Sequence, residues 1–301
     1  MSSDYHLGEL EVQAQAGVRD KAARMIRTIH AAIPPVAQEF LRSQPMAVLG
    51  TVDARGRAWA SLVTGEPGFM QAVDERTVRI DAELTPGDPL RENLQTNDVL
   101  GLVAVEFATR KRIRINGTAE VRGEGELIVH TEQVYSNCPK YIQAREWELL
   151  PGASSTTESV QSGTALTDEQ RQWIAEADTF FIASYDPEGG ADASHRGGNP
   201  GFVRAVHDKA LVWPDYVGNN MFNTLGNVAQ NPMAGLLFMD FENGDTLQVT
   251  GRVRIVWEAE RAAEFAGAER LVEFDVEEVI HTVGASSVRW RFEEYSRYNP
   301  G

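Results

Sequence analysis

One stretch of the chain, from Ser194 to Gly251, gathers residue types that together could bind a phosphate and a flat ring. A cation, Arg196, precedes two glycines, and a turn at 218–220 precedes a short predicted helix. The first N–H groups of a helix have no backbone partners and bind phosphate, and an arginine adds a charge-assisted hydrogen bond. Trp213 and Tyr216 could cover a ring. The stretch therefore predicts a site for an anionic ligand with a planar ring.

The candidate phosphate-binding groups each have an ordinary structural alternative. Arg196 either binds phosphate or forms a surface salt bridge. Gly197-Gly198 either let the ligand approach the backbone closely or form a plain turn. Three further polar residues either donate to phosphate or cap the helix, and they are Asn219, Asn223 and Thr224.

The candidate ring contacts are also open to two interpretations. Trp213 either stacks on the ring or lies buried in the core, and His195 either lies near the ring or is an ordinary residue at a strand end. Pro214 and Asp215 follow Trp213 directly. Because a carboxylate repels a phosphate, Asp215 is expected to face hydroxyl groups of the ligand or a donor of the protein.

Composition limits the class of protein. With 28 basic and 44 acidic residues the net charge is -16, which disfavours binding to nucleic acid or an anionic membrane surface. The single cysteine, Cys138, allows no intrachain disulfide, which is typical of the cytoplasm. The first residues lack a secretion signal, no run of about 18 apolar residues predicts a membrane span, and the six histidines lack metal-site spacing. We therefore expect a cytoplasmic protein without a metal site.

Apolar periodicity predicts helices first and short strands from Met46 onward. Residues 9–32 have helical spacing, and Pro34-Pro35 ends this helix and can start another. Residues 130–150 are interpreted as a strand end leading into a helix. Residues 151–165 are rich in Ser, Thr and Gly and predict a linker, after which Thr167 is expected to cap a helix.

The pattern after the linker repeats the pattern before it. The residues PGF and AV recur at the same spacing in 67–73 and 200–206. With an offset of 134 residues, Asn93 meets Asn227, and Gly101 and Gly117 meet Gly235 and Gly251. Ordered matches at a nearly constant offset predict two copies of one β-rich domain.

The two copies differ where the ligand is expected. Arg196 aligns with Val63, so the first copy lacks the cation. The first copy instead carries Asp88 and Glu92 near the start of the corresponding helix, where carboxylates would repel a phosphate. The second copy is therefore predicted to bind the ligand, and the first to supply walls.

Six segments together resemble the flavin-binding part of the pyridoxamine 5'-phosphate oxidase-like family of FMN-binding split β-barrels. They are HRGG at 195–198, GFV at 201–203, WPDY at 213–216, GNNMFNTLGN at 218–227, NP at 231–232 and GLLFMDF…LQVTG at 235–251. The match is closest to a tandem two-barrel branch of probable FMN-dependent enzymes. The resemblance implies a mainly β (α+β) fold of two tandem split β-barrels with short flanking helices, forming an internal pseudo-dimer.

The resemblance also divides the chain and adds cofactor-binding candidates. It implies an N-terminal helical segment at 1–45, a first barrel at 46–150 with a degenerate site, the linker at 151–165 and an FMN-binding second barrel at 166–301. Four residues are carried over as FMN contacts because they lie on strands that meet FMN in the family: Thr246, Gln248, Arg289 and Trp290.

A further word, Asn137 to Tyr141, is similar to one that recurs in the tandem branch. Lys140 is expected to reach an anionic substrate or the flavin phosphate from the other half, with Tyr141 beside it. Cys138 is grouped with them near the substrate. The alternatives for its thiol are a nucleophile and a packed small side chain, and the latter is favoured because flavin chemistry needs no thiol.

The family implies an FMN-dependent oxidoreductase that moves a hydride through flavin N5, with a small-molecule substrate, possible use of NAD(P)H and possible homodimers. Vitamin B6 oxidase activity itself is not expected, because Thr246 stands where those oxidases have Gln and their substrate-phosphate pattern is missing. A non-catalytic flavin carrier or sensor is the alternative. A haem binder with His195 as axial ligand and a scaffold without cofactor also stay open.

Two polar groups outside the stretch are ambiguous. Arg110, Arg112 and Arg114 alternate along one strand face, which favours a solvated or salt-bridged face, the rival being a phosphate contact between the two copies. His6, Glu9 and Gln13 lie near the start of the first helix. They are interpreted as surface residues, with a cap over a ligand pocket as the alternative.

Overall fold

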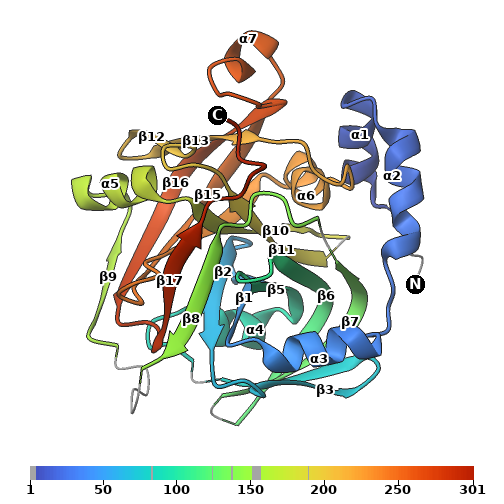
Figure 1. The fold of residues 1–301 in the computed structure, drawn as a ribbon, viewed down its shortest axis with the longest axis vertical. Helices are drawn as coiled ribbons and strands as arrows, with labels where there is room; N and C mark the ends of the chain where they lie inside the picture. The colour runs from blue at the N-terminus through green and yellow to red at the C-terminus, as the bar shows by residue number, and fades with distance from the viewer. Residues whose placement is uncertain (1–4, 83, 124, 137, 151–156, 189) are drawn as a thin grey trace.

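A computed structural model describes residues 5–82, 84–123, 125–136, 138–150, 157–188 and 190–301 (Figure 1). The fold is mostly β, with one large sheet from each half of the chain and helices around them. This confirms the mainly β fold class predicted from the sequence.

The first sheet follows the order β2-β1-β5-β6-β7-β4-β3, and all its neighbouring strands are antiparallel. Its strands are β1 (Met46–Val52), β2 (Ala58–Thr64), β3 (Met70–Asp74), β4 (Thr77–Asp81), β5 (Val99–Glu106), β6 (Lys111–Arg122) and β7 (Glu126–Ser136). Alternate residues of these strands, such as Leu102 and Ile115, form one apolar core inside the curved sheet.

The second sheet repeats this topology strand for strand, in the order β11-β10-β14-β15-β16-β13-β12. Its strands are β10 (Thr179–Asp186), β11 (Gly190–Gly197), β12 (Arg204–His207), β13 (Ala210–Asp215), β14 (Met233–Met239), β15 (Thr246–Val256) and β16 (Arg270–Val283). Its core contains Phe180, Trp213 and Phe238. Two copies of one strand order are the outcome that the sequence repeat predicts.

The repeat extends to a kink in each sheet. The pairing of β6 with β7 shifts register between Asn116 and Gly117, and the pairing of β15 with β16 shifts between Thr250 and Gly251. A Cβ on either glycine would lie 2.0 Å from a backbone oxygen of the neighbouring strand. Glycine is therefore required at both bulges, which explains the Gly117–Gly251 match in the sequence.

The two halves pack against each other through a seam between β5 and β11 and between β14 and β2. One apolar cluster contains residues of both halves, including Val48, Ala60, Phe181 and Leu237. A Cβ on Gly101 would lie 2.4 Å from the Asp192 Cα, and a Cβ on Gly235 would lie 2.7 Å from the Trp59 Cα. These backbones approach so closely that the halves form an internal pseudo-dimer.

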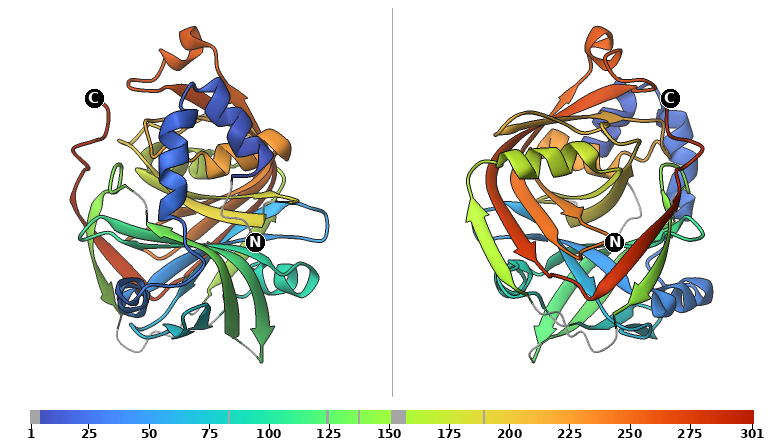
Figure 2. Two further views of the ribbon diagram at one scale, coloured as in Figure 1. Left: turned by 90° about the vertical axis from the view of Figure 1, so that its right-hand side faces the viewer. Right: turned by 60° about the vertical axis from the view of Figure 1, so that its left-hand side comes forward.

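Short helices flank the sheets; α1 packs against α6, and α2 lies beside α1 (Figure 2). The helices are α1 (Leu7–Gln15), α2 (Arg19–Met25), the 3-10 helix η1 (Ile26–Thr28), α3 (Pro35–Ser43), α4 (Leu90–Thr96), α5 (Asp168–Glu176), α6 (Asn223–Gln230) and α7 (Ala259–Ala262). Within the described residues, none of them has both the length and the apolar character that crossing a membrane requires.

Two helix predictions have different outcomes. The single helix expected over 9–32 is wrong: Gly17, with a left-handed φ of 69°, separates α1 from α2, and the 3-10 helix η1 follows α2 directly. The cap predicted at Thr167 is confirmed, because its hydroxyl accepts a hydrogen bond from the Gln170 N–H at 3.2 Å.

The helix predicted within 130–150 is also wrong. Ala144–Leu149 form strand β8, which pairs with the late strand β17 (Val288–Glu294) in a separate two-stranded sheet. This long-range pairing outweighs local helix propensity. Arg145 on β8 also donates to both carboxylate oxygens of Asp178 at 2.7 Å, with both side chains buried, so the end of the first half is tied to the second.

The predicted linker is only partly described. Residues 151–156 lie outside the described residues, whereas Ser159–Gly163 form strand β9 and pair with β16. Because β9 is an exposed edge strand, its sequence has no apolar periodicity, and the strand was therefore not predicted. The domain boundaries at 45, 150 and 165 stay predictions.

Candidate functional site

A pocket opens at one end of the seam and is lined by both halves of the chain. Its walls are β6, the segment 138–141, the ends of β11 and β13, and the loop leading into α6. Eleven of the predicted site residues line it: Cys138, Lys140, Tyr141, His195, Arg196, Gly197, Pro214, Asp215, Asn219, Asn223 and Thr224. The structure thus brings most of the predicted residues to one place.

Three arginines dominate the pocket. Arg112 and Arg114 come from β6 of the first half, and Arg196 comes from β11 of the second. Burial lowers the pKa of Arg112 to about 9, with smaller contributions from the charges of Arg114 and Arg196. Burial also lowers the pKa of Arg114 and of Arg196. Such a like-charged cluster has an unfavourable energy that a bound anion would relieve.

The donors of these arginines are incompletely satisfied by the described residues. Arg114 forms an ion pair with Asp192 and donates to the Asn223 Oδ1 at 3.5 Å. Arg112 forms no ion pair with a described carboxylate, and Nε of both Arg112 and Arg114 is buried without a described hydrogen-bond partner. Buried donors of this kind fit an oxygen-rich anion.

His195 lies against Arg112 and is neutral. The Arg112 Nη1 lies 3.0 Å from the His195 Nδ1, and because arginine can only donate, Nδ1 accepts and the ring proton resides on Nε2. Burial, and then the charge of Arg112, hold the pKa of His195 well below its ordinary value. Its Nε2 is buried without a described partner. His195 therefore carries one ring N–H without a described hydrogen-bond partner.

Asp215 is neutralised by protein cations. Its Oδ2 accepts from the Arg270 Nη1 at 2.6 Å, and its Oδ1 lies 3.6 Å from the Arg196 Nη1. Of the two expected partners of Asp215, a ligand hydroxyl or a protein donor, the structure shows a protein donor, Arg270. The ion pair also fixes Arg196, whose side chain is 28% exposed, at the pocket rather than in bulk solvent.

The segment before α6 is held in an uncommon backbone conformation. Among the described residues, four that are not glycine have positive φ, and three of them line the pocket: Tyr141, Asn220 and Phe222. Phe222 is the N-cap of α6, where no side chain caps the helix and no acidic residue occupies the first turn. Backbone strain gathers at functional sites, and a helix start without a cap leaves N–H groups for an anion.

The cavity volume limits what the pocket encloses. It measures about 100 Å³, whereas pockets that bury an entire organic ligand hold about 300–1,000 Å³. Tyr141 and Tyr216 narrow the mouth with ring centroids 5.1 Å apart, and the Tyr141 hydroxyl donates to the Val217 carbonyl. A phosphate group fits the enclosed part, and a larger ligand must extend through the open side or displace this aromatic pair.

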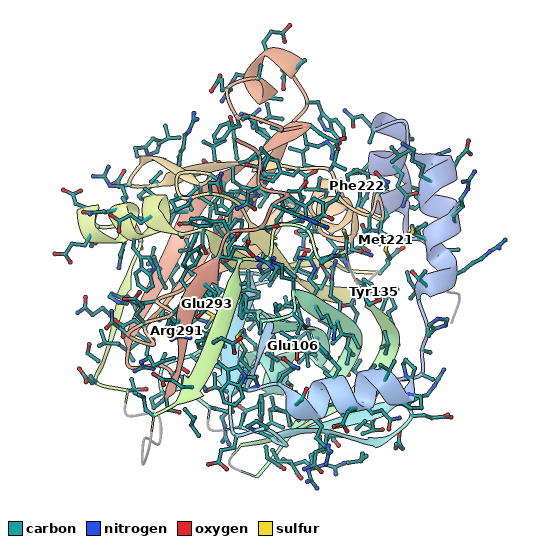
Figure 3. The ribbon with its side chains drawn as sticks, viewed as in Figure 1. Glu106, Tyr135, Met221, Phe222, Arg291 and Glu293 are labelled. Carbon is teal, nitrogen blue, oxygen red and sulfur yellow. The ribbon has the colours of Figure 1, made fainter. Side chains whose placement is uncertain are left out.

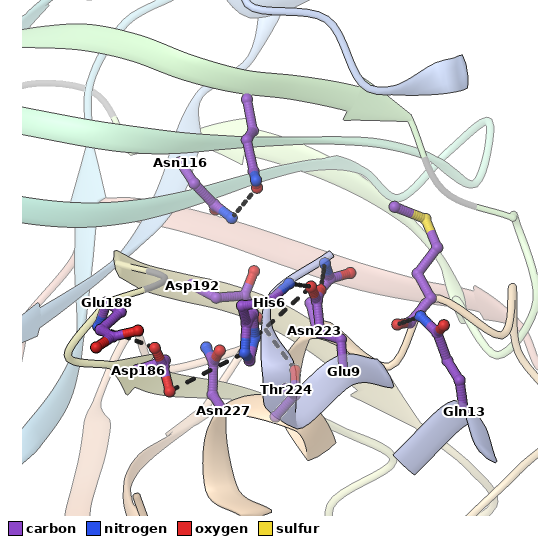
Figure 4. A network of polar contacts seen from close by, with 12 residues as sticks. His6, Glu9, Gln13, Asn116, Asp186, Glu188, Asp192, Asn223, Thr224 and Asn227 are labelled. Atoms are coloured by element: carbon purple, nitrogen blue, oxygen red, sulfur yellow. Dashed lines mark hydrogen bonds and ion pairs between the residues drawn. The ribbon is translucent and has the colours of Figure 1, made fainter. Parts of the chain in front are cut away.

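The N-terminal helix supports the pocket from behind. Glu9 and Gln13 are buried, with 5% and 1% of their surface exposed, so their interpretation as surface residues is wrong. Glu9 accepts from the Asn223 Nδ2 at 2.6 Å, while Thr224 donates to Asp192 at 3.1 Å (Figure 4). Asn223 also contacts Arg114, so α1 is connected to the pocket through the first residues of α6.

The buried Glu9 predicts a pH-dependent stability. Burial raises its pKa from 4.5 to about 7, so between these values the folded chain holds a proton that the unfolded chain releases. The free energy of unfolding should therefore fall as the pH rises from about 4.5 to about 7, by roughly 2–3 kcal/mol from this group.

Chemical unfolding of the native chain and of Glu9→Gln across this range tests the prediction. As the pH rises, the free energy of unfolding of Glu9→Gln should increase relative to that of the native chain. His6, Arg114, Asp186 and Asn223 also act on Glu9 and are kept in both proteins. A difference that does not vary with pH would contradict the prediction.

Four predicted residues lie outside the pocket. Trp213 is 2% exposed and packs edge-on against Phe180 in the second core, so it cannot cover a bound ring and the buried alternative holds. Gly198 packs on the Phe202 side chain, which leaves no room for a Cβ at this position. Arg289 donates to the carbonyl of Val288 at 3.0 Å on β17. Trp290 is buried in the cluster shared by both halves.

Thr246 and Gln248 also lie outside the pocket, because the pseudo-symmetry of the two halves places them at the other end of the seam. At the repeat offset of 134 they correspond to Arg112 and Arg114, so they face the other end of the seam. There the Gln248 Nε2 donates to the Ala60 carbonyl at 2.9 Å and to Asp88 at 3.0 Å.

That other end of the seam is occupied by the protein's own hydrogen bonds. Asp88 accepts from Ser61 at 2.6 Å and from the Leu90 N–H at 2.8 Å, and burial raises its pKa to about 6. Glu92 lies in the first turn of α4. A carboxylate stands where the first pocket has an uncapped helix start, so the two ends are chemically opposite.

Arg112 and Arg114 line the pocket, although their alternation with Arg110 in the sequence favoured a solvated or salt-bridged face. Arg110, however, does not line this pocket and donates to Glu294 at 2.7 Å. The repeat contained the necessary signal, because a strand of one half faces the site of the other half in a pseudo-dimer. Figure 3 labels a second crossing of this kind, where Tyr135 of the first half packs in one apolar cluster with Met221 of the second.

The fold and the site together define a tandem split-barrel protein with a cationic pocket at one end of the seam between its halves. The family model for pyridoxamine 5'-phosphate oxidase matches residues 33–149 and 166–283, which is more than half of the chain. The chain therefore belongs to the pyridoxamine 5'-phosphate oxidase family. A search of the curated proteins found no match.

Solved structures similar to this chain span about one of its halves. HupZ from Group A Streptococcus is 17% identical over 38% of this chain and 91% of its own, with a TM-score of 0.32. An FMN-binding protein from Syntrophomonas wolfei is 11% identical over 38% and 84%, with a TM-score of 0.29. HutZ, a haem storage protein from Vibrio cholerae, is 13% identical over 37% and 89%, with a TM-score of 0.27.

Proposed function

We propose that the pocket binds FMN by its phosphate and that the chain is an FMN-dependent oxidoreductase. The observation that carries the proposal is Arg112, a partly buried cation without an acidic partner among the described residues, placed beside Arg196 at the uncapped start of α6. A dianionic phosphate complements this arrangement. Membership of the oxidase family supports the choice of FMN among phosphorylated ligands.

Within this proposal the protein binds and orients, and the cofactor supplies the redox chemistry. FMN, when bound, accepts and returns a hydride, so no side chain is required as an acid or a base. Arg112, Arg114 and Arg196 hold the phosphate, and the His195 Nε2–H offers a fixed neutral donor. Tyr141 and Tyr216 limit access of water at the mouth. The substrate is a small molecule, with NAD(P)H as a candidate electron donor.

Absorption spectroscopy tests this function. The purified chain, or the chain after addition of FMN, should show the visible bands of bound flavin, and NADH or NADPH should bleach them without oxygen. Bands that persist with every donor tried would favour a flavin carrier over an enzyme. A Soret band, or no binding of added FMN, would overturn the proposal in favour of a haem binder or a scaffold.

A further inference from the structure

A second and larger pocket lies at the open end of the first barrel, and no function described above uses it. It has a volume of about 720 Å³ and lies between α3, η1 and the ends of β6 and β7. Figure 1 shows α3 lying across this end of the first sheet. The volume falls within the range of about 300–1,000 Å³ that is usual for small organic ligands.

The floor of the pocket is apolar. Phe40 of α3 lines it together with Ile113 and Val134 of the sheet. Val36 is 79% exposed, which leaves a large aliphatic side chain in water at the rim. An apolar group bound here would cover these side chains and remove their surface from water, which favours binding.

The rim is cationic although the chain as a whole is strongly acidic. Arg27, Arg110, Lys111 and Arg112 line the pocket together with His30, and no Asp or Glu is among its described lining residues. Arg110 is already paired with Glu294, whereas the Lys111 side chain is 68% exposed and its Nζ forms only a long ion pair with Glu106, at 3.8 Å. In a chain of net charge -16, such a rim is a local attraction for anions.

We propose that this pocket binds an organic anion that joins one carboxylate to an apolar body. The body lies against Val36, Phe40 and Ile113, and the carboxylate lies at the rim near Lys111 and Arg27. An uncharged ligand would leave the rim unused, and a small inorganic anion would leave the floor uncovered. This pocket does not depend on the FMN proposal, although Arg112 lines both cavities.

Calorimetric titration with 1-naphthoate, together with its uncharged analogue 2-naphthol, tests the proposal. We expect naphthoate to bind one site, and 2-naphthol at least about tenfold more weakly, since a charge-assisted hydrogen bond contributes about 1.5–3 kcal/mol. Lys111→Glu should weaken naphthoate by about tenfold or more. Val36→Glu should also weaken naphthoate binding by about tenfold or more, because the new carboxylate would repel the carboxylate of the ligand.

Matched controls separate this pocket from the others. Lys209→Glu changes the charge equally at an exposed lysine outside both pockets and should leave the affinity unchanged. Arg196→Ala disables the first pocket and should also leave it unchanged. Circular dichroism shows whether each variant is folded, and both main substitutions are at exposed side chains.

Four outcomes would overturn the proposal. They are no binding of naphthoate, equal binding of 2-naphthol, an equal loss with Lys209→Glu, and a loss confined to Arg196→Ala. The last would place the anion in the first pocket.

Discussion

The Arg112→Met variant is expected to bind FMN about tenfold to a hundredfold more weakly than the native chain. Arg112 has no acidic partner among the described residues, so an incoming phosphate is its natural counter-ion, and losing such a charge-assisted hydrogen bond costs roughly 1.5–3 kcal/mol. Fluorescence titration of the cofactor-free proteins measures the affinity.

The same variant should stay nearly as stable as the native chain when no cofactor is bound. Burial and the neighbouring charges of Arg114 and Arg196 disfavour the charged state of Arg112 in the empty pocket. Losing that cost offsets the lost hydrogen bond to His195, so the free energy of unfolding should change by less than about 1 kcal/mol.

Arg110→Met on the same strand is the matched control, because Arg110 donates to Glu294 outside the first pocket. Its affinity for FMN should not change. Equal affinities of Arg110→Met and Arg112→Met would contradict the assignment of Arg112.

Gly235→Val is expected to cost at least about 3 kcal/mol of stability, the largest effect that we predict from packing. A Cβ at this position would lie 2.5 Å from the Ala58 carbonyl oxygen and 2.7 Å from the Trp59 Cα, and both are backbone atoms that cannot rotate away. The two halves must separate to admit the side chain. Urea unfolding measures the loss.

Gly163→Ala provides the comparison for the seam. Its added Cβ would meet only the Ala165 oxygen, at an ordinary 3.5 Å, and its φ is not left-handed. This change should alter stability by no more than about 0.5 kcal/mol. If Gly235→Val were as mild, the close contact between β14 and β2 would not hold the halves together.

Much of the fold could be predicted because the residues that match between the two copies include glycines at positions where no other residue fits. Gly117 and Gly251 match because each allows a β-bulge, and Gly101 and Gly235 match because each allows the halves to touch. Strand β8 could not be predicted, because its partner β17 lies about 140 residues later and short strands and helices share apolar patterns.

The candidate site was only half predictable. Arg196 and the start of α6 lie in one continuous stretch, so their proximity follows from local sequence. Arg112 and Arg114 enter through the pseudo-symmetry, which places a strand of the first half at the site of the second. The same symmetry moves Gln248 to the opposite end of the seam, where Asp88 binds it. Burial of Glu9 depends on docking of α1 on α6, which periodicity alone does not show.

The most direct test of the central claim is the stoichiometry of FMN binding, measured by titrating the cofactor-free chain. We predict one FMN for each chain, with binding weakened by roughly 1.5–3 kcal/mol in Arg196→Ala. Two FMN molecules for each chain, no binding, or undiminished affinity in Arg196→Ala would contradict the account of a seam with one cationic end that binds FMN and one acidic end that the protein's own hydrogen bonds occupy.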